Sequence, residues 1–169
     1  MDTSSTIAQF AKMLDNLDRW LEASAAFATG KGFEVDVLAA SRLAPDQFNL
    51  VQQVQSACDA AKFAAAYLSG QTAPSHPDTE TTIAELRDRV RTCVAYVRGV
   101  PASQFDGAAD RRVSPAWMQG KWVRGDDYLT GIAVPNFYFH VVTAYAILRH
   151  NGVALGKMDF IGGIEMKDA

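Results

Sequence analysis

The sequence predicts an all-α protein folded as a four-helix bundle, and three observations point to that fold class. Four long segments carry apolar side chains three or four positions apart, which is the spacing of one helix face. Glycine and proline separate these segments, and the alternating pattern of strands is almost absent. We therefore expect a single domain over residues 1–169, with helices at about 5–29, 46–69, 82–98 and 127–150 and a tail at 153–169.

Composition limits the class of binding partner and the cellular compartment that we expect for this protein. The chain has 169 residues, 49% of them hydrophobic, which is enough for one well-filled core. The net charge is −3 and the basic residues are dispersed, so we expect no nucleic-acid partner, because phosphate binding needs clustered Lys and Arg. Cys58 and Cys93 lie inside apolar helical patterns and are expected to be buried thiols in a reducing cytoplasm.

The N-terminal residues do not resemble a secretory signal, since Met1 to Ser5 form neither a basic nor an apolar region. We also expect Lys, Gln or Asp to interrupt each apolar run before it reaches the length of a membrane span. Together these observations predict a cytoplasmic protein without a membrane partner.

The first two predicted helices have regular apolar stripes and end at glycines. Gly30 and Gly32 end the first helix, whose stripe consists of Ile7, Phe10, Leu14, Leu17, Leu21, Ala25 and Ala28. Pro45 suits the first turn of the second helix, because its missing N–H costs nothing there. Gly70 ends the second helix, whose stripe consists of Val51, Val54, Cys58, Ala61, Ala65 and Leu68.

A long linker precedes the third helix. Residues 71–78 include two prolines, and a connector of this kind can cross the end of a bundle instead of forming a tight hairpin. Thr82 and Glu85 have the spacing of a capping box and predict where the third helix begins. Gly99 ends this helix, whose inward positions are Ile83, Leu86, Val90, Cys93 or Val94, and Val97.

Residues 100–126 are the least regular part of the chain. A turn at Gln119–Gly120 would allow a short hairpin over 113–123. Trp117 and Trp122, on either side of this turn, are expected to cover the end of the bundle, although they could also line a groove or a dimer contact.

The fourth helix is expected to continue through Pro135 or to kink there, and to end at Asn151–Gly152. The first half of the tail is apolar enough to dock on the bundle, whereas the last residues are expected to be loose.

His140 is the first candidate for chemistry, since the standard catalytic and phosphate-binding motifs are absent from the sequence. It shares a helix face with the apolar residues Phe137, Val141, Ala144 and Leu148, so its ring should point inward. Such a histidine is either a core residue bonded through one ring nitrogen or a metal ligand or general base.

A polar row on the second helix is the other candidate, formed by Gln52, Gln55, Asp59 and Lys62. The row is either a solvated helix edge with an Asp59–Lys62 pair or one side of a pocket. If the second and fourth helices are antiparallel with Asp46 level with His150, Gln55 lies at the depth of His140. This arrangement predicts a pocket for a small polar molecule or a cation, lined by His140, Gln55, Asp59, Gln52, Tyr145 and Asn136.

His76, Asp78 and Glu80 alternate along the linker. Alternating ligands on an extended loop can hold a cation, but a polar loop before a helix has the same pattern. We favour the polar loop, because acidic groups near a helix N-terminus are stabilised by the helix dipole.

Several of these segments resemble an uncharacterised bacterial family that is grouped with the DinB-like superfamily of four-helix bundles. The segments are 42–46, 53–55, Asp59, 78–82 with 85–86, and 135–140 through Gly152, so the resemblance covers nearly the whole chain. It implies an up-down-down-up bundle with a long crossover between the second and third helices, and it also implies a homodimer.

The resemblance also implies a cofactor. Characterised DinB-like relatives often bind a divalent metal through one histidine of the second helix and an H-x-x-x-H pair of the fourth, and some use it to activate a thiol. Only His140 matches this pattern, since Ala144 follows four residues later and the second helix offers glutamines and Asp59. His140 is therefore the one candidate metal ligand.

Three hypotheses for function follow. The leading one is a bundle that binds a small molecule in a polar pocket around His140. The second is a metal-dependent transferase or isomerase that uses a thiol and has a degenerate metal site. The third is a structural, dimeric stress protein in which His140 is packed and bonded.

Overall fold

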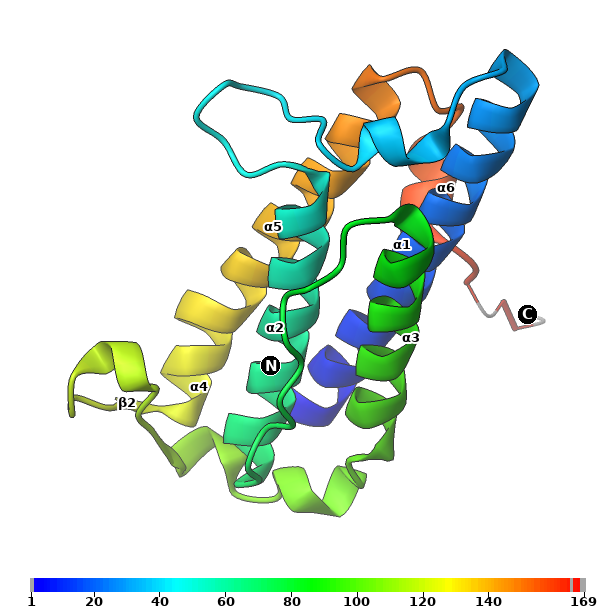
Figure 1. The fold of residues 1–169 in the computed structure, drawn as a ribbon. Helices are drawn as coiled ribbons and strands as arrows, with labels where there is room; N and C mark the ends of the chain where they lie inside the picture. The colour runs from blue at the N-terminus through cyan, green and yellow to red at the C-terminus, as the bar shows by residue number, and fades with distance from the viewer. Residues whose placement is uncertain (1, 165, 168–169) are drawn as a thin grey trace.

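A computed structural model, which describes residues 2–164 and 166–167, shows the predicted four-helix bundle (Figure 1). The long helices are α1 (Thr3–Lys31), α2 (Leu50–Ser69), α3 (Ile83–Gly99) and α5 (Val134–His150). Helix α1 runs opposite to α2, α3 runs parallel to α2, and α5 runs parallel to α1. The up-down-down-up topology is therefore confirmed.

The parallel direction of α2 and α3 requires a long crossover. We call residues 70–82 the strap; it leaves the C-terminal end of α2 and returns along the bundle to the end where α2 began (Figure 1). The predicted capping box holds its end, since the Thr82 side chain accepts a hydrogen bond from the Glu85 N–H and the Glu85 carboxylate accepts one from the Thr82 N–H.

The core lies between the four long helices and contains the predicted stripes. Leu14, Leu17 and Leu21 of α1 are fully buried, as are Cys58 of α2 and Cys93 of α3. Helix α2 is central, because it packs against α1, α3 and α5. It buries residues on most of its circumference, which the single predicted stripe did not anticipate.

The start of α2 differs from the prediction. The helix begins at Leu50 and not near Pro45, because Asn49 caps it. The Asn49 side chain accepts a hydrogen bond from the Gln52 N–H at 3.0 Å, and the Gln52 side chain accepts one from the Asn49 N–H at 3.1 Å. This second capping box leaves Pro45 in a loop, preceded by the short helical turn η1 (Val35–Leu38).

The fourth bundle helix is longer than predicted and is not uniform. Helix α4 (Gly125–Tyr128) leads into the π-helical turn η5 (Leu129–Ala133), which leads into α5. Pro135 lies in the first turn of α5, next to this turn. A π-turn changes the backbone hydrogen-bond pattern, so it can accommodate a proline that has no N–H to donate.

This segment also corrects the expectation about apolar runs. Gly125–His150 is long and apolar enough to span a bilayer by length and composition alone, because no Lys, Gln or Asp interrupts it between Leu129 and Leu148. Its inner face is a core face, however, with Phe137, Val141, Ala144, Ile147 and Leu148 buried in the bundle. The core helix of a soluble protein satisfies the same criterion.

The region between α3 and α4 contains the predicted hairpin. Strands β1 (Arg112–Val113) and β2 (Val123–Arg124) pair antiparallel, and Gln119 and Gly120 both have positive φ between them. Short helical turns η2 (Ala102–Phe105), η3 (Ala108–Asp110) and η4 (Ala116–Met118) complete this region. The hairpin projects from the bundle in Figure 1 and does not cover its end, so the favoured expectation for Trp117 and Trp122 is wrong, whereas the alternative of a groove holds for Trp117, which lines a cleft described below.

The tail docks on α1 as expected for its first half. Helix α6 (Lys157–Ile161) places the Asp159 carbonyl 3.0 Å from the Trp20 indole nitrogen, and Phe160 stacks on the same indole. The Asn16 side chain donates to the Phe160 carbonyl at 2.9 Å. Among the last residues of the tail, which we predicted to be loose, residues 165 and 168–169 lie outside the described part of the chain.

Candidate functional site

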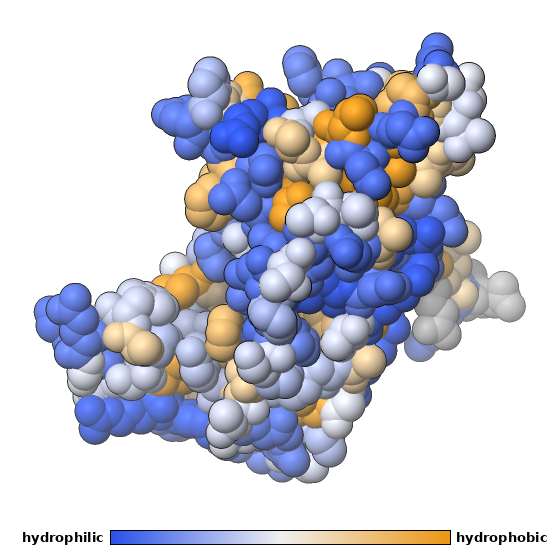
Figure 2. All heavy atoms as spheres, in the orientation of Figure 1, coloured by the Kyte–Doolittle hydropathy of each residue, from blue (hydrophilic) through white to orange (hydrophobic). Residues whose placement is uncertain are grey.

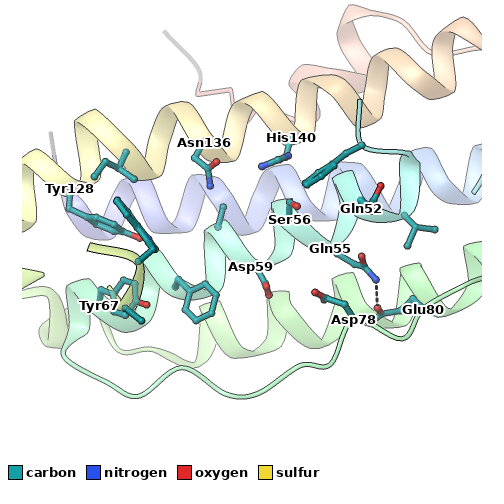
Figure 3. Close-up of a pocket in the computed structure, with 17 residues that line it drawn as sticks. Gln52, Gln55, Ser56, Asp59, Tyr67, Asp78, Glu80, Tyr128, Asn136 and His140 are labelled. Atoms are coloured by element: carbon teal, nitrogen blue, oxygen red, sulfur yellow. Dashed lines mark hydrogen bonds between the residues drawn. The ribbon is translucent and has the colours of Figure 1, made fainter. Parts of the chain in front are cut away.

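A cleft of about 1000 Å³ opens between α2 and α5. The loop before α2 and the hairpin project on either side of it, and the surface is hollowed between them (Figure 2). Its polar end is lined by Gln52, Gln55, Ser56, Asp59, Asp78, Glu80, Asn136 and His140 (Figure 3). Its aromatic end is lined by Phe63, Tyr67, Trp117 and Tyr128.

His140 reaches the cleft from α5 and is held by Gln53 of α2. Its Nδ1 lies 2.8 Å from Gln53 Oε1. The Gln53 amide is oriented by its own Nε2, which donates to the Phe48 carbonyl at 3.3 Å, so Oε1 is the atom that faces the ring. Nδ1 must therefore carry the proton, which leaves the Nε2 lone pair of His140 available to the cleft.

Burial keeps this ring neutral. His140 is half-buried, and desolvation lowers its pKa below the usual 6.5. Its Nε2 has no partner among the described residues and is not sealed from solvent. The neutral ring is therefore a hydrogen-bond acceptor that a ligand can reach.

His140 and Gln55 line the same cleft, but the hydrogen-bond partner of His140 is Gln53, which lies on another face of α2 because two residues turn a helix by about 200°. Gln55 instead donates to Glu80 of the strap at 2.9 Å. The sequence shows only the polar row of α2. Because α2 is buried on several faces, the fully buried Gln53 lies beside that row.

Five of the six predicted pocket residues line the cleft: His140, Gln55, Asp59, Gln52 and Asn136. The sixth, Tyr145, does not join them. Its ring packs edge-on against Trp20 and Phe160, on the side of α5 that faces α1 and the tail. Five residues along a helix turn the chain by about 500°, so Tyr145 cannot share the orientation of His140.

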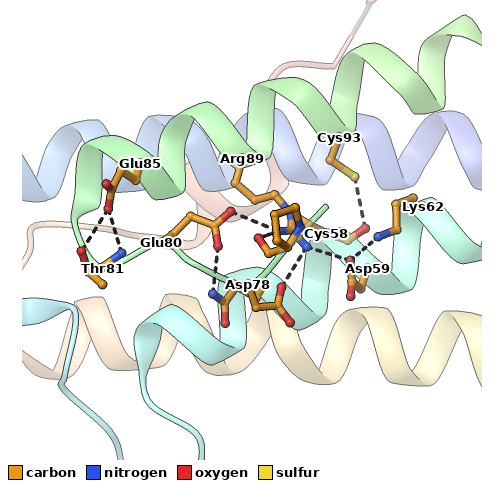
Figure 4. Close-up of polar contacts among 11 residues, drawn as sticks. Cys58, Asp59, Lys62, Asp78, Glu80, Thr81, Glu85, Arg89 and Cys93 are labelled. Atoms are coloured by element: carbon orange, nitrogen blue, oxygen red, sulfur yellow. Dashed lines mark hydrogen bonds and ion pairs between the residues drawn. The ribbon is translucent and has the colours of Figure 1, made fainter. Parts of the chain in front are cut away.

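Beside the polar end lies a group of charged residues that we call the Arg89 cluster, formed by Arg89, Asp59, Asp78, Glu80 and Lys62 (Figure 4). Arg89 Nη2 lies 2.8 Å from Asp59 and 3.1 Å from Asp78, and Nη1 lies 3.0 Å from Glu80. Lys62 lies 2.7 Å from Asp59. The cluster thus joins α2, α3 and the strap.

The two cations of the cluster are withdrawn from solvent. The side chains of Arg89 and Lys62 are only 2% and 3% exposed, and neither residue lines the cleft. Burial opposes the charge of Arg89, but the carboxylates of Asp59 and Glu80 outweigh it and raise the pKa of the guanidinium. Burial likewise opposes ionisation of Glu80, but the hydrogen bonds from Gln55 and Arg89 lower its pKa.

These contacts settle two expectations about polar residues. The Asp59–Lys62 pair forms, but Lys62 is buried, so the row is not a solvated edge. Asp78 and Glu80 belong to a polar loop before α3, as we favoured, but their carboxylates pair with Arg89 in addition to lying near the helix N-terminus. His76 is next to the cluster, and burial together with Lys62 and Arg89 lowers the pKa of its ring.

Sequence reasoning missed Arg89, the residue at the centre of the cluster. A signal was present, because Arg89 lies three residues after Leu86 and four before Cys93, at a core position of the third helix. A charged residue at such a position is rarely buried unless it is paired. Its partners come from two other segments, which the pattern of α3 alone does not identify.

The residues of the cleft do not fit a zinc or nickel centre. In the described part of the chain, no group of three His, Cys, Asp or Glu side chains could hold a metal ion. Ala144 stands where the family pattern would place a second histidine, and His140 is the one imidazole among the residues that line the cleft. The carboxylates of Asp59, Asp78 and Glu80 pair with Arg89, and the one imidazole with the remaining amide side chains is a poor set of ligands for either metal.

The bundle and its crossover define the class of protein, a DinB-like helical bundle. A crystal structure of a DinB family member protein from Shewanella denitrificans is 48% identical in sequence and superimposes with a TM-score of 0.92, over 96% of this chain and 93% of that chain. The family model described as a domain of unknown function, DUF1993, matches residues 3–161, and the chain belongs to that family. No curated protein matches the chain.

Proposed function

We propose that the protein binds a small organic molecule in the cleft between α2 and α5. The observation that supports this proposal most directly is the state of His140. Its ring is neutral, its tautomer is set by Gln53, and its Nε2 lone pair is available to the cleft. A ligand hydroxyl, amine or amide would donate its hydrogen to this nitrogen.

The rest of the cleft has the composition of a ligand site. Such sites combine aromatic walls with a few convergent polar groups. Tyr67 and Tyr128 supply the aromatic walls, and burial raises the pKa of both phenols, so they remain neutral. The side chains of Ser56 and Asn136 add polar groups to the wall of the cleft.

The other hypotheses have less support. A thiol-using, metal-dependent enzyme would need a ligand set that the cleft does not supply. A purely structural role does not account for an open cleft with a half-buried, oriented histidine. A homodimer, a cytoplasmic location and the absence of nucleic-acid and membrane partners remain predictions.

The three tryptophans allow a direct test of where a molecule binds. Trp117 lines the cleft, Trp20 is buried under the tail, and Trp122 lies on the hairpin against Arg112. In an NMR screen of small organic fragments, we expect bound fragments to shift the indole N–H signal of Trp117 and to leave that of Trp20 unchanged. A screen in which no fragment shifts Trp117 contradicts the proposal.

A pair of variants then tests His140. The double variant Gln53→Leu with His140→Phe removes both hydrogen-bonding partners, so no buried amide is left facing a lost ring. Fragments that donate to Nε2 should bind about tenfold more weakly, the value of one neutral hydrogen bond. His150→Phe, at the exposed end of α5, is the control and should leave their affinity unchanged.

A further inference from the structure

We propose that the cleft selects an organic cation, a molecule with a primary ammonium group on a short aliphatic chain that ends in an aromatic ring. This inference rests on the proposed function, because it names the class of molecule that the same cleft would take. It follows from the signs of the charges that reach the cleft and from the distance between its charged and aromatic groups.

The charged groups that line the cleft are all acidic. Asp59, Asp78 and Glu80 line it, whereas their cationic partners are buried behind them. The cluster contains three carboxylates and two cations, so one negative charge is left uncompensated. An anionic ligand would meet this charge without a cation to pair with.

Two carboxylate oxygens remain for a ligand. Arg89 Nη2 binds Oδ1 of both Asp59 and Asp78, which brings these two carboxylates together. Lys62 also binds Oδ1 of Asp59. Each Oδ2 atom has no hydrogen bond to a described residue and is not buried, since the Asp59 and Asp78 side chains are 30% and 56% exposed. An ammonium group carries three N–H donors, enough for both oxygens.

The aromatic wall begins one helical turn from this position. Phe63 follows Asp59 by four residues on α2, which places it about 6 Å along the axis, and Tyr67 follows by one turn more. Tyr128 packs edge-on against Tyr67, at 5.7 Å between ring centroids, and extends the wall across to α4. A ring separated from its ammonium by two or three carbons would therefore reach Phe63.

His140 then distinguishes among such cations. Its neutral Nε2 accepts a hydrogen bond and carries no positive charge that would repel an ammonium group. A second donor on the ligand, such as a hydroxyl group, would use this nitrogen while the ammonium group occupies the carboxylates.

The test compares three probes of one shape, 2-phenylethylamine, 2-phenylethanol and 3-phenylpropionate, titrated against the full chain while the Trp117 indole signal is followed. We expect the amine to bind at least about tenfold more tightly than the alcohol, as a charge-assisted hydrogen bond does, and the carboxylate to bind most weakly. Added salt should weaken binding of the amine and leave that of the alcohol nearly unchanged.

Asp78→Asn is the decisive variant, because its amide oxygen can still accept from Arg89 while the charge is lost. It should reduce the preference for the amine several-fold, whereas the control Asp88→Asn, exposed on α3, should not. Equal binding of all three probes, or a preference for the carboxylate, overturns this inference and leaves small-molecule binding intact. Failure of every probe to shift Trp117 also overturns it, and the fragment screen then decides separately whether the cleft binds small molecules.

Discussion

At the scale of single residues, Arg89 is the side chain that connects most segments of the site. Its fork of N–H groups donates to Asp59 of α2, to Asp78 and Glu80 of the strap, and to the Pro77 carbonyl. A lysine could not reach these acceptors together, because an ammonium group is a single point of charge. Arg89 therefore fixes the strap as a wall of the cleft.

Replacing Arg89 should be costly. Arg89→Met keeps much of the volume but removes the cation that Asp78 and Glu80 share, and it leaves Asp59 with Lys62 alone. Loss of one partner from a buried ionic group typically costs about 3–5 kcal/mol, and we expect that decrease in the free energy of unfolding in urea.

Arg91→Met is the matched control on the same helix. Arg91 is 54% exposed and makes only 3.4 Å contacts with Asp18 and Asp88, so its loss should cost less than about 1 kcal/mol. Equal effects of the two variants would mean that the Arg89 cluster contributes no more than a surface ion pair.

Individual residues of the site were predictable when their own helix supplied the signal. His140 could be placed on a helix face from spacing alone, and it lines the cleft together with the predicted Asn136. The partner of His140 could not be identified, because Gln53 and Gln55 lie on different faces of α2 and the sequence does not show which of them meets α5. Tyr145 lies five residues after His140 and therefore points away from the cleft, toward Trp20.

At the scale of elements, the start of α4 is controlled by a close approach between backbones. Gly125 lies directly against the Ala108 carbonyl of η3, so that an added Cβ would overlap the carbonyl oxygen. Helix α4 can begin there only because the residue has no side chain. This contact fixes the short turns after α3 against the helix that carries Tyr128 and leads to His140.

Gly125→Ala should therefore destabilise the protein by about 3 kcal/mol, the upper end of the usual cost of overpacking, since the clash involves backbone that cannot rotate away. Thermal and urea unfolding would measure the change. Gly131→Ala is the control in the adjacent π-turn, where no atom lies within 4 Å of the added Cβ, and it should be neutral or slightly stabilising. A neutral Gly125→Ala would refute the close approach.

The first residue of a helix can be predicted where the residues that cap it are close together in the sequence. The Thr82–Glu85 box gave the start of α3 to within one residue, whereas the Asn49–Gln52 box was overlooked in favour of Pro45. A proline can begin a helix, but it makes no cap, and the reciprocal hydrogen bonds of Asn49 and Gln52 define the N-terminus of α2. The π-turn before Pro135 has no sequence signal as specific as these.

At the scale of the whole molecule, the cleft is a product of topology. Parallel helices α2 and α3 require the strap, and the strap carries Asp78 and Glu80 along one side of the cleft that α5 borders on the other. The family resemblance implies the crossover, and Pro74 and Pro77 mark a linker that can provide it. The sequence does not predict the cleft, because the gap depends on how the strap and the hairpin both lie against α2 and α5.

The pH dependence of the free energy of unfolding tests the burial of His140, His76 and Glu80 together. Burial lowers the pKa of His140 and of His76 below 6.5, so the unfolded chain binds protons more readily than the folded protein below that pH. The pKa of Glu80 is lowered below 4.5 in the same sense. Stability rises with pH wherever the unfolded state holds more protons, so all three groups favour the folded state at neutral pH.

We therefore expect the urea midpoint to be highest near neutral pH, to decrease as the pH falls below about 6.5, and to decrease again below about 4.5. The Gln53→Leu, His140→Phe double variant should retain only the His76 part of the first decrease, and Glu80→Gln should lose its share of the second. These profiles can be compared by urea titrations at closely spaced pH values in a constant ionic strength. A urea midpoint that rises as the pH is lowered from 7 to 5 would mean that the two imidazoles gain a proton on folding. The neutral acceptor proposed at the centre of the cleft would then be wrong.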